Sequence, residues 1–246
     1  MTSLFRGLCF NLYLLILTLT MGLGALPIRL LKNKRWALSY AKLWSKAVLY
    51  GFQRICSVQI EVLGQENIPK GPVIIASQHQ SFFDGFVWMN LVPLPAYIIK
   101  KELTKIPLVG PMLILSGMIP VERSAGSKAL RDMIKTTTEA HAQNRQIIIF
   151  PEGTRTLPGE RHPVQPGIIA LARQSNVPII PVATNSGIFW ERNPWRKHSG
   201  ILKVVIGSPL SSTTSRQGFI NNLEKNWETL CKSHNLPFYV VDKSVE

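Results

Sequence analysis

The residues best suited to acid–base chemistry in this 246-residue sequence are a histidine and an aspartate five positions apart. His79 and Asp84 lie in the segment SQHQSFFDG, residues 77–85, directly after a short apolar run typical of a buried strand. Residues five apart do not share one face of a regular helix, so the two side chains meet only if a turn separates them. Asp84 then accepts a hydrogen bond from one ring nitrogen of His79, and the other nitrogen is free to act as a base toward a hydroxyl group. A structural interpretation competes with this one, because Ser81 and Asp84 also fit the S-x-x-D capping box of a helix start.

A second segment, FPEGTR at residues 150–155, has the residue types of an anion-binding turn. It follows an apolar run, and Pro151 and Gly153 favour a sharp turn whose backbone N–H groups can face an anion. Arg155 offers a two-pronged guanidinium group that matches phosphate. Glu152 is a poor direct ligand for an anion, so we expect it to orient Arg155 or a hydroxyl group of a substrate. Taken alone, the segment also fits an exposed turn with an incidental arginine.

Two more segments lie near expected strands. GMIPVER, residues 117–123, brings Arg123 to the same edge of the sheet if the sheet is parallel, and a second guanidinium group suits a phosphomonoester. For Arg123 alone, an exposed strand end is the simpler interpretation. VPIIPV, residues 177–182, is chemically inert and suits a buried edge strand or an apolar wall.

Short runs rich in β-branched residues alternate with longer polar or helical stretches from Val58 onward, which is typical of an α/β domain. We therefore predict a mixed, largely parallel sheet flanked by helices. The expected strands are 73–76, 96–99, 118–121, 147–150, 179–183 and 201–206, and the expected helices are 128–143, 167–174 and 216–232. A loop rich in Pro and Gly at 157–167 follows a strand end and is a candidate wall of the site.

The N-terminal region predicts contact with a membrane. Residues 7–28 form 22 consecutive uncharged positions rich in Leu, long enough for a helix to cross the hydrocarbon core of a bilayer. A signal peptide fits less well, because Pro27 and a basic run follow instead of a small-residue cleavage site. A buried core helix is a third alternative. Arg6 precedes the stretch and four basic residues follow closely, so we expect the rest of the chain on the cytoplasmic side of a cell's inner membrane.

Residues 35–56 have the spacing of an amphipathic helix with aromatic and basic side chains, among them Trp36, Tyr40 and Lys42. Such residues favour the headgroup zone, where this helix would pair with the first as a helical hairpin. An ordinary helix packed on the core is equally consistent. We divide the chain into a membrane anchor with an interfacial helix at 1–56 and a second domain at 57–246.

The formal net charge of +14 attracts polyanions but does not choose among nucleic acid, anionic lipid and phosphorylated small molecules. Its distribution favours lipid, because residues 1–56 hold eight basic residues and no acidic one. Nucleic acid is not an expected partner, since no binding motif for it is recognisable. The three cysteines are far apart and form no C-x-x-C pair, so neither a metal site nor a dense disulfide framework is expected.

The four segments HQSFFD, GMIPVER, FPEGTR and VPIIPV, in this order over residues 72–182, resemble the blocks of the glycerolipid acyltransferase family. The similarity is greatest to the bacterial 1-acyl-sn-glycerol-3-phosphate acyltransferases. KKELTKIPLVG, residues 100–110, also resembles the family's connecting sequence. Many members have Asn before the histidine, where this chain has Gln78, and this mild departure puts no role in doubt.

This resemblance implies an acyltransferase domain at 57–246 in which His79, oriented by Asp84, deprotonates the sn-2 hydroxyl group of lysophosphatidic acid. The oxygen attacks the thioester of acyl-CoA or acyl carrier protein and gives phosphatidic acid. It implies no metal, no cofactor and no covalent acyl-enzyme. The residues that it assigns to the acceptor and its phosphate are Lys100, Lys101, Gly117, Arg123, Glu152, Gly153, Thr154 and Arg155.

Two other functions remain open at this stage. The same chemistry fits another lyso-lipid acceptor, such as lyso-ornithine lipid, in which case Arg123 and Arg155 hold a carboxylate. A non-catalytic lipid-binding protein is the alternative from another class, and the presence of both His79 and Asp84 disfavours it. The expected partners are a lysophospholipid, an acyl donor and membrane lipid.

Overall fold

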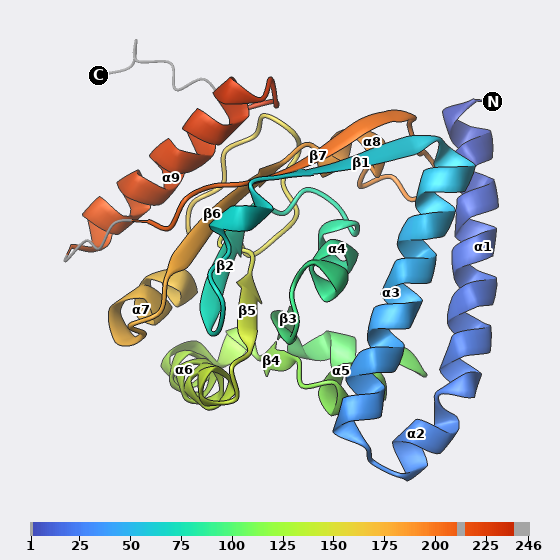
Figure 1. The fold of residues 1–246 in the computed structure, drawn as a ribbon, viewed down its shortest axis with the longest axis horizontal. Helices are drawn as coiled ribbons and strands as arrows, with labels where there is room; N and C mark the ends of the chain where they lie inside the picture. The colour runs from blue at the N-terminus through green and yellow to red at the C-terminus, as the bar shows by residue number, and fades with distance from the viewer. Residues whose placement is uncertain (1, 211–214, 239–246) are drawn as a thin grey trace.

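A seven-stranded mixed sheet is the centre of the computed structural model, which describes residues 2–210 and 215–238 (Figure 1). The strand order is β1-β7-β6-β2-β5-β3-β4, and every neighbouring pair is parallel except β6 and β7. The strands are β1 (Val58–Leu63), β2 (Val73–Ser77), β3 (Pro95–Lys100), β4 (Ile119–Val121), β5 (Gln146–Ile149), β6 (Ile179–Thr184) and β7 (Gly200–Ile206). The predicted fold class is therefore confirmed.

Helices cover both faces of this sheet (Figure 1). The α-helices are α1 (Ser3–Gly24), α2 (Leu26–Leu30), α3 (Lys34–Cys56), α4 (Asp84–Leu91), α5 (Val109–Leu115), α6 (Gly126–Ala142), α7 (Pro166–Gln174), α8 (Ser186–Phe189) and α9 (Arg216–Ser233). Three 3₁₀ turns, Gln65–Asn67, Lys101–Lys105 and Arg123–Ala125, link some of these elements.

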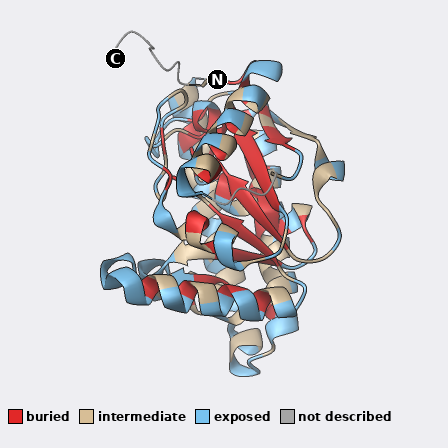
Figure 2. Ribbon diagram, turned by 90° about the vertical axis from the view of Figure 1, so that its left-hand side faces the viewer, coloured by how far each residue is buried: buried red, intermediate tan, exposed pale blue. Residues whose placement is uncertain are grey.

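The two faces of the sheet bury different side chains, because successive residues of a strand point to opposite sides. In β2, Ile75 joins the core under α1, α3 and α4, whereas its neighbour Ile74 joins the core under α6, α7 and α9. Ile148 and Ile147 of β5 alternate in the same way. Figure 2 shows the strands as the buried centre and the helices buried along one side. Burial on both faces explains the continuous apolar runs of these strands.

Some elements differ from those expected from the sequence. VPIIPV is not an edge strand, because β6 pairs with β2 on one side and β7 on the other, and that expectation is wrong. Pro181 is tolerated there because its carbonyl accepts from the N–H of Gly207 on the β7 side, one residue before the ladder with β7 begins at Val182. The edge strand β1, at the opposite edge from β4, was missed, although VQIEVL alternates apolar and polar residues.

Helices α1 and α3 pack side by side as a helical hairpin (Figure 1). The Tyr13 hydroxyl donates to the backbone carbonyl of Ala47 at 2.8 Å, and the Tyr40 hydroxyl donates to that of Met21 at 3.0 Å. Among the described residues, α1 alone is long and apolar enough to cross a membrane by length and composition. The uncharged stretch is interrupted at Ala25, where α1 ends and the short α2 follows.

The first 56 residues share a core with the sheet. Phe10 of α1 lies in the same apolar cluster as Ile75, and its ring centroid is 4.8 Å from that of Trp190 in an edge-on contact. The division into an anchor and a second domain stays a prediction, and residues 211–214 and 239–246 of that second part lie outside the described residues.

The amino-terminal end of α1 is tied to the segment that follows α8. Backbone and side-chain bonds join Lys197 N–H to the Ser3 carbonyl at 3.1 Å and Asn11 Nδ2 to the Pro194 carbonyl at 2.7 Å. Gly7 permits this approach, since a Cβ on it would lie 2.0 Å from the carbonyl oxygen of Trp195.

We expect Gly7→Ala to destabilise the protein by about 1–3 kcal/mol, because the added methyl group meets backbone that cannot move aside cheaply. For a chain of this size that lowers the midpoint of thermal unfolding by roughly 2–4 °C per kcal/mol. Gly167→Ala in α7 is the matched control: its Cβ would meet nothing nearer than Met133 Cε at 3.4 Å, and alanine favours the helix in both variants. Equal midpoints for the two variants would contradict the docking of α1 on this segment.

Candidate active site

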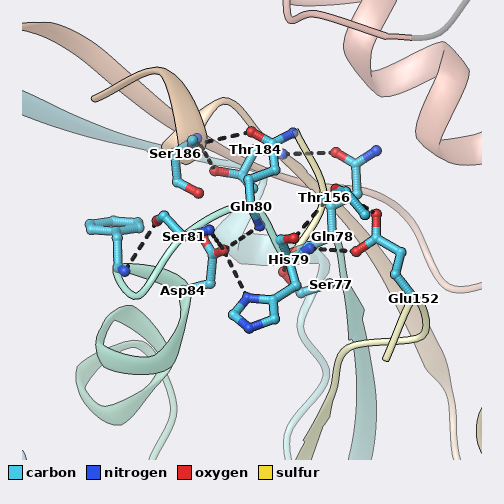
Figure 3. Close-up of polar contacts among 12 residues, drawn as sticks. Ser77, Gln78, His79, Gln80, Ser81, Asp84, Glu152, Thr156, Thr184 and Ser186 are labelled. Carbon is cyan, nitrogen blue, oxygen red and sulfur yellow. Dashed lines mark hydrogen bonds and ion pairs between the residues drawn. The ribbon is translucent and has the colours of Figure 1, made fainter. Parts of the chain in front are cut away.

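His79 lies two residues beyond the carboxyl end of β2, in a tight turn that leads to α4 (Figure 3). Nδ1 of its ring is 3.1 Å from Oδ2 of Asp84. The same carboxylate oxygen accepts hydrogen bonds from the backbone N–H groups of Gln80 at 2.8 Å and Ser81 at 2.9 Å. The structure therefore brings together the pair expected from the sequence, and Asp84 leaves Nε2 of the ring unengaged.

The competing interpretation of Asp84 as a helix cap is also partly realised. Helix α4 begins at Asp84, and its N-cap residue, Phe83, makes no side-chain capping hydrogen bond. The Ser81 hydroxyl accepts from the backbone N–H of Phe83 at 3.1 Å, while Asp84 accepts from the N–H of Ser81. The two side chains thus stabilise the turn before the helix. One carboxylate both shapes this turn and orients the imidazole.

The imidazole of His79 stacks on the ring of Phe150. The two ring centroids are 4.1 Å apart with an interplanar angle of 17°, so the rings stack. The His79 side chain retains 20% exposure, whereas Asp84 retains 3%. A histidine that is fixed by a buried carboxylate and a stacked ring, yet still reachable, has the arrangement of a general base.

Glu152 reaches the backbone of His79 from the turn after β5 (Figure 3). Its Oε2 accepts from the backbone N–H of His79 at 2.7 Å, and its Oε1 lies 3.3 Å from the hydroxyl of Thr156. The expectation that Glu152 orients Arg155 is thereby corrected, because its two oxygens contact His79 N–H and Thr156. The alternative, a contact with a substrate hydroxyl group, stays a prediction. Burial raises the pKa of Glu152 to about 8, and the negative charge of Asp84 adds to the rise. At neutral pH the side chain is therefore mainly a neutral acid.

Further polar side chains hold the turn, and sequence reasoning missed them. Gln78 accepts from the backbone N–H of Thr184 at 3.2 Å, and Gln80 accepts from that of Gly187 at 3.2 Å. The N–H of Thr156 donates to the carbonyl of His79 at 2.8 Å. The five residues that contact one another or His79 here are all buried, whereas His79 itself is partly exposed: Gln78, Gln80, Thr156, Thr184 and Gly187. Two glutamines flanking a histidine directly after an apolar strand were the available signal, since buried amides need partners.

Arg123 reaches the FPEGTR turn from β4, as the parallel arrangement requires. Its Nη1 donates to the carbonyl of Gly153, which has φ of +71° and so adopts a conformation that favours glycine. At the neighbouring strand ends, Lys101 and Glu122 form an exposed ion pair at 2.6 Å, and Lys100 lies 3.8 Å from Glu102. Both lysines are thus at the correct edge of the sheet.

Arg155 extends from the same turn toward the His79 loop. Its guanidinium carbon lies 4.0 Å from the ring centroid of Phe82, and its Nη1 is buried without a hydrogen-bond partner among the described residues. Burial lowers the pKa of Arg155, and the positive charge of Arg192 lowers it further. A buried guanidinium donor without an acceptor is well suited to an anionic ligand. Thr154, one residue earlier, is exposed.

Gly117 is the assigned residue that the structure does not bring to this edge. It precedes β4, whereas Arg123 follows it, so the two lie at opposite ends of the strand. A Cβ on Gly117 would lie 1.7 Å from Nη1 of Arg145, whose guanidinium donates to the carbonyls of Pro95 and Ser116. Gly117 makes room for that guanidinium, which corrects the expectation that it lies among the acceptor-binding residues.

Comparison with known proteins agrees with the predicted family. The family model described as Acyltransferase matches residues 59–185. The 1-acyl-sn-glycerol-3-phosphate acyltransferase of Pseudomonas aeruginosa is 33% identical over 164 residues, covering 67% of this chain and 64% of that protein. The 1-acyl-sn-glycerol-3-phosphate acyltransferase alpha of Homo sapiens is 30% identical over 170 residues, covering 67% of this chain and 59% of that protein. The matches thus span less than two thirds of these relatives.

A solved structure has the same fold. The crystal structure of the 1-acyl-sn-glycerophosphate (LPA) acyltransferase PlsC from Thermotoga maritima superposes with a TM-score of 0.64 and 21% sequence identity. The superposition covers 92% of this chain and 98% of that one.

We expect Glu152→Gln to become progressively more stable than the unsubstituted protein as pH rises from 5 toward 8. The pKa of Glu152 is raised from 4.5 to about 8 on folding, so its stabilising effect is complete below pH 4.5 and is lost as pH rises through 8. Between these values the difference grows by about 1.4 kcal/mol per pH unit. Glutamine keeps the bond from His79 N–H and can donate to Thr156, so the turn stays intact.

Unfolding midpoints in urea at pH 5, 6, 7 and 8 measure this difference. Glu139→Gln, on the exposed side of α6, is the control and should show no such trend. A stability difference between Glu152→Gln and the unsubstituted protein that is constant over this range would mean that Glu152 is ionised in the folded state.

Proposed function

The chain belongs to the acyltransferase family, and from this premise we propose that it acylates the sn-2 hydroxyl group of 1-acyl-glycerol-3-phosphate. The donor is a thioester, acyl-CoA or acyl carrier protein, and the product is phosphatidic acid. The observation that carries the proposal is the His79–Asp84 pair at 3.1 Å, with the second ring nitrogen unengaged by Asp84 and the guanidinium of Arg155 one turn of chain away.

In the proposed reaction His79 acts through Nε2. The Nδ1–H donates to Asp84, which fixes the neutral tautomer with its lone pair on Nε2. Nε2 takes the proton of the acceptor hydroxyl while the oxygen attacks the thioester carbonyl. The C–S bond then breaks, and the departing thiolate receives the proton back from Nε2. Asp84 stays ionised and stabilises the imidazolium that forms between the two steps.

Little else is needed from the protein, because a thioester already has a good leaving group. The Phe150 ring and the bonds to the His79 peptide hold the base in one position, which avoids reorganisation during the reaction. Arg155, and Arg123 on the opposite side of the FPEGTR turn, supply positive charge for the acceptor's phosphate. The exposed lysines Lys100 and Lys101 add to the positive potential at this edge.

We expect His79→Ala to lower kcat/KM by about 10²- to 10⁴-fold, because the general base is lost. Asp84→Asn should lower it substantially too, since an amide no longer favours the neutral tautomer that His79 needs. The assay follows thiol release from acyl-CoA with lysophosphatidic acid as acceptor. His234→Ala, at the end of α9, is the control. Unchanged turnover in His79→Ala would rule out this mechanism, and turnover only with a lyso-aminolipid would replace the acceptor.

We place the protein on a membrane surface, where its insoluble substrates are. One face of α1 is apolar and exposed along its whole length: Leu4, Phe5, Leu8, Leu12, Leu15, Ile16, Leu19 and Leu23. Trp36, Leu43 and Tyr50 of α3 are exposed at intervals of seven, which puts them on one side of that helix. Lys32, before α3, and Lys34 and Arg35, in its first turn, are exposed and suit anionic headgroups.

This arrangement favours a helix that lies in the surface of one leaflet over one that crosses the bilayer. Both ends of α1 are held against the folded chain, Gly7 by Trp195 and Gly22 by Leu108, and a crossing helix would have to leave both contacts. The apolar face then dips into the leaflet while the opposite face stays on the protein. In a bacterium this surface would be the cytoplasmic side of the inner membrane.

We expect Leu15→Glu to reduce binding to vesicles at least several-fold, because a charge would enter the acyl region. Cosedimentation with vesicles of phosphatidylethanolamine and phosphatidylglycerol measures the bound fraction. Thr229→Glu, which adds the same charge to the exposed side of α9, should bind as the unsubstituted protein does. Equal binding by both variants would contradict the proposed membrane face of α1.

A further inference from the structure

A pocket of about 620 Å³ lies beside the turn that carries His79. Its walls include Gln80, Leu157, Ile188 and Arg192, which come from the His79 turn, the loop after FPEGTR, α8 and the segment after α8. Figure 1 shows α8 close to the amino-terminal end of α1. None of the roles proposed above uses this pocket.

Hydrogen bonds of Gln80 connect the pocket wall to the proposed reaction centre. The backbone N–H of Gln80 donates to Asp84, and its side chain accepts from the N–H of Gly187 in α8. Leu157, two residues after Arg155, lies on another wall. Two lining residues are therefore close in sequence to the proposed site: Gln80 follows His79 directly, and Leu157 is two residues after Arg155.

Arg192 lines the pocket, and its charge is felt by Arg155 in the neighbouring FPEGTR turn. The positive charge of Arg192 acts on Arg155, whose Nη1 is buried and has no partner among the described residues. Arg192 itself makes no ion pair within the described part of the chain. Glu191 and His198 also line the pocket, and the carboxylate of Glu191 is 2.5 Å from the imidazole of His198, so it already has a partner. Two like charges held near each other repel unless an anion binds to them.

The other walls combine apolar side chains, among them Leu157 and Ile188, with the polar side chains of Glu191, Asn193, His198 and Ser199. Leu157 and Ile188 keep 49% and 37% of their surface exposed. Exposed apolar side chains beside two guanidinium groups fit a molecule that carries both a phosphate and an apolar or thioester-bearing chain. Both substrates of the proposed reaction have this character, since the acceptor has a phosphomonoester and CoA or carrier protein has a phosphopantetheine arm.

We infer that Arg155 and Arg192 bind a phosphate group of one of these substrates at the mouth of this pocket, and that Arg192 is a binding residue for the reaction. The inference rests on the proposed function for the identity of the ligand. Arg192 lies beyond residues 59–185, which the family model matches, so the family's motifs do not include it.

The test compares Arg192→Gln with Arg196→Gln, an exposed arginine on the same segment that does not line the pocket. We expect Arg192→Gln to raise KM for one phosphate-bearing substrate about tenfold, or ~1.4 kcal/mol, with little change in kcat. Arg196→Gln should leave both KM values unchanged. Equal KM values in the two variants, for both acyl-CoA and lysophosphatidic acid, would overturn the inference.

The source of the phosphate follows from substrates that lack it. If the acceptor is the ligand, the effect of Arg192→Gln disappears with 1-monoacylglycerol in place of lysophosphatidic acid. If the donor is the ligand, it disappears with an acyl-N-acetylcysteamine thioester in place of acyl-CoA. Either result supports the subsite and identifies its occupant.

Inorganic phosphate separates the failure of this inference from the failure of the proposed function. Phenylglyoxal modifies accessible arginines, and mass spectrometry of the full-length protein gives the rate at Arg192. Protection of Arg192, but not of Arg196, by millimolar phosphate supports the subsite even if lysophosphatidic acid is not acylated. The same rate with and without phosphate overturns it.

Discussion

The turn between β2 and α4 depends on the bonds that hold the peptide of His79 from two sides. The carboxylate of Asp84 accepts from the ring and from two following N–H groups. Two residues of the turn after β5 bond to the His79 peptide. Glu152 accepts from the His79 N–H, and the N–H of Thr156 donates to the His79 carbonyl. The proposed base, His79, is therefore fixed in both its backbone and its side chain. Strands β2 and β5 pair directly, so the sheet itself sets the distance between these two turns.

Burial on both faces of the sheet is what makes that distance rigid. The side chains of β2 and β5 alternate between the core under α3 and α4 and the core under α6, α7 and α9. A shift of either strand by one residue would exchange these two sets of side chains, which the packed helices do not permit. Apolar side chains thus set the register of these strands, and the register positions the polar residues in the turns that follow. The raised pKa of Glu152 fits this setting, since burial disfavours the charged form of its carboxyl group.

The proposed membrane face belongs to the same fold. The hairpin of α1 and α3 packs on the core by one side and leaves apolar residues exposed on another. The segment after α8 is bonded to the start of α1 and also lines the pocket beside His79. The proposed membrane face and the candidate active site are therefore linked through one short stretch of chain.

The sequence by itself determined the fold class, the family, the pair His79 and Asp84, and the apolar N-terminal helix. These follow from local patterns, because strand and helix periodicity and a motif of fixed spacing depend only on neighbouring residues. Only the tertiary structure decided that β6 is an internal strand, that Gly117 lies at the end of β4 opposite to Arg123, and that Glu152 accepts from the backbone N–H of His79. It also decided that α1 is held along the protein, which composition cannot distinguish from a helix that crosses a membrane. Strand order and contacts between residues far apart in the chain arise from the packing of all elements together, and a local pattern carries no record of them.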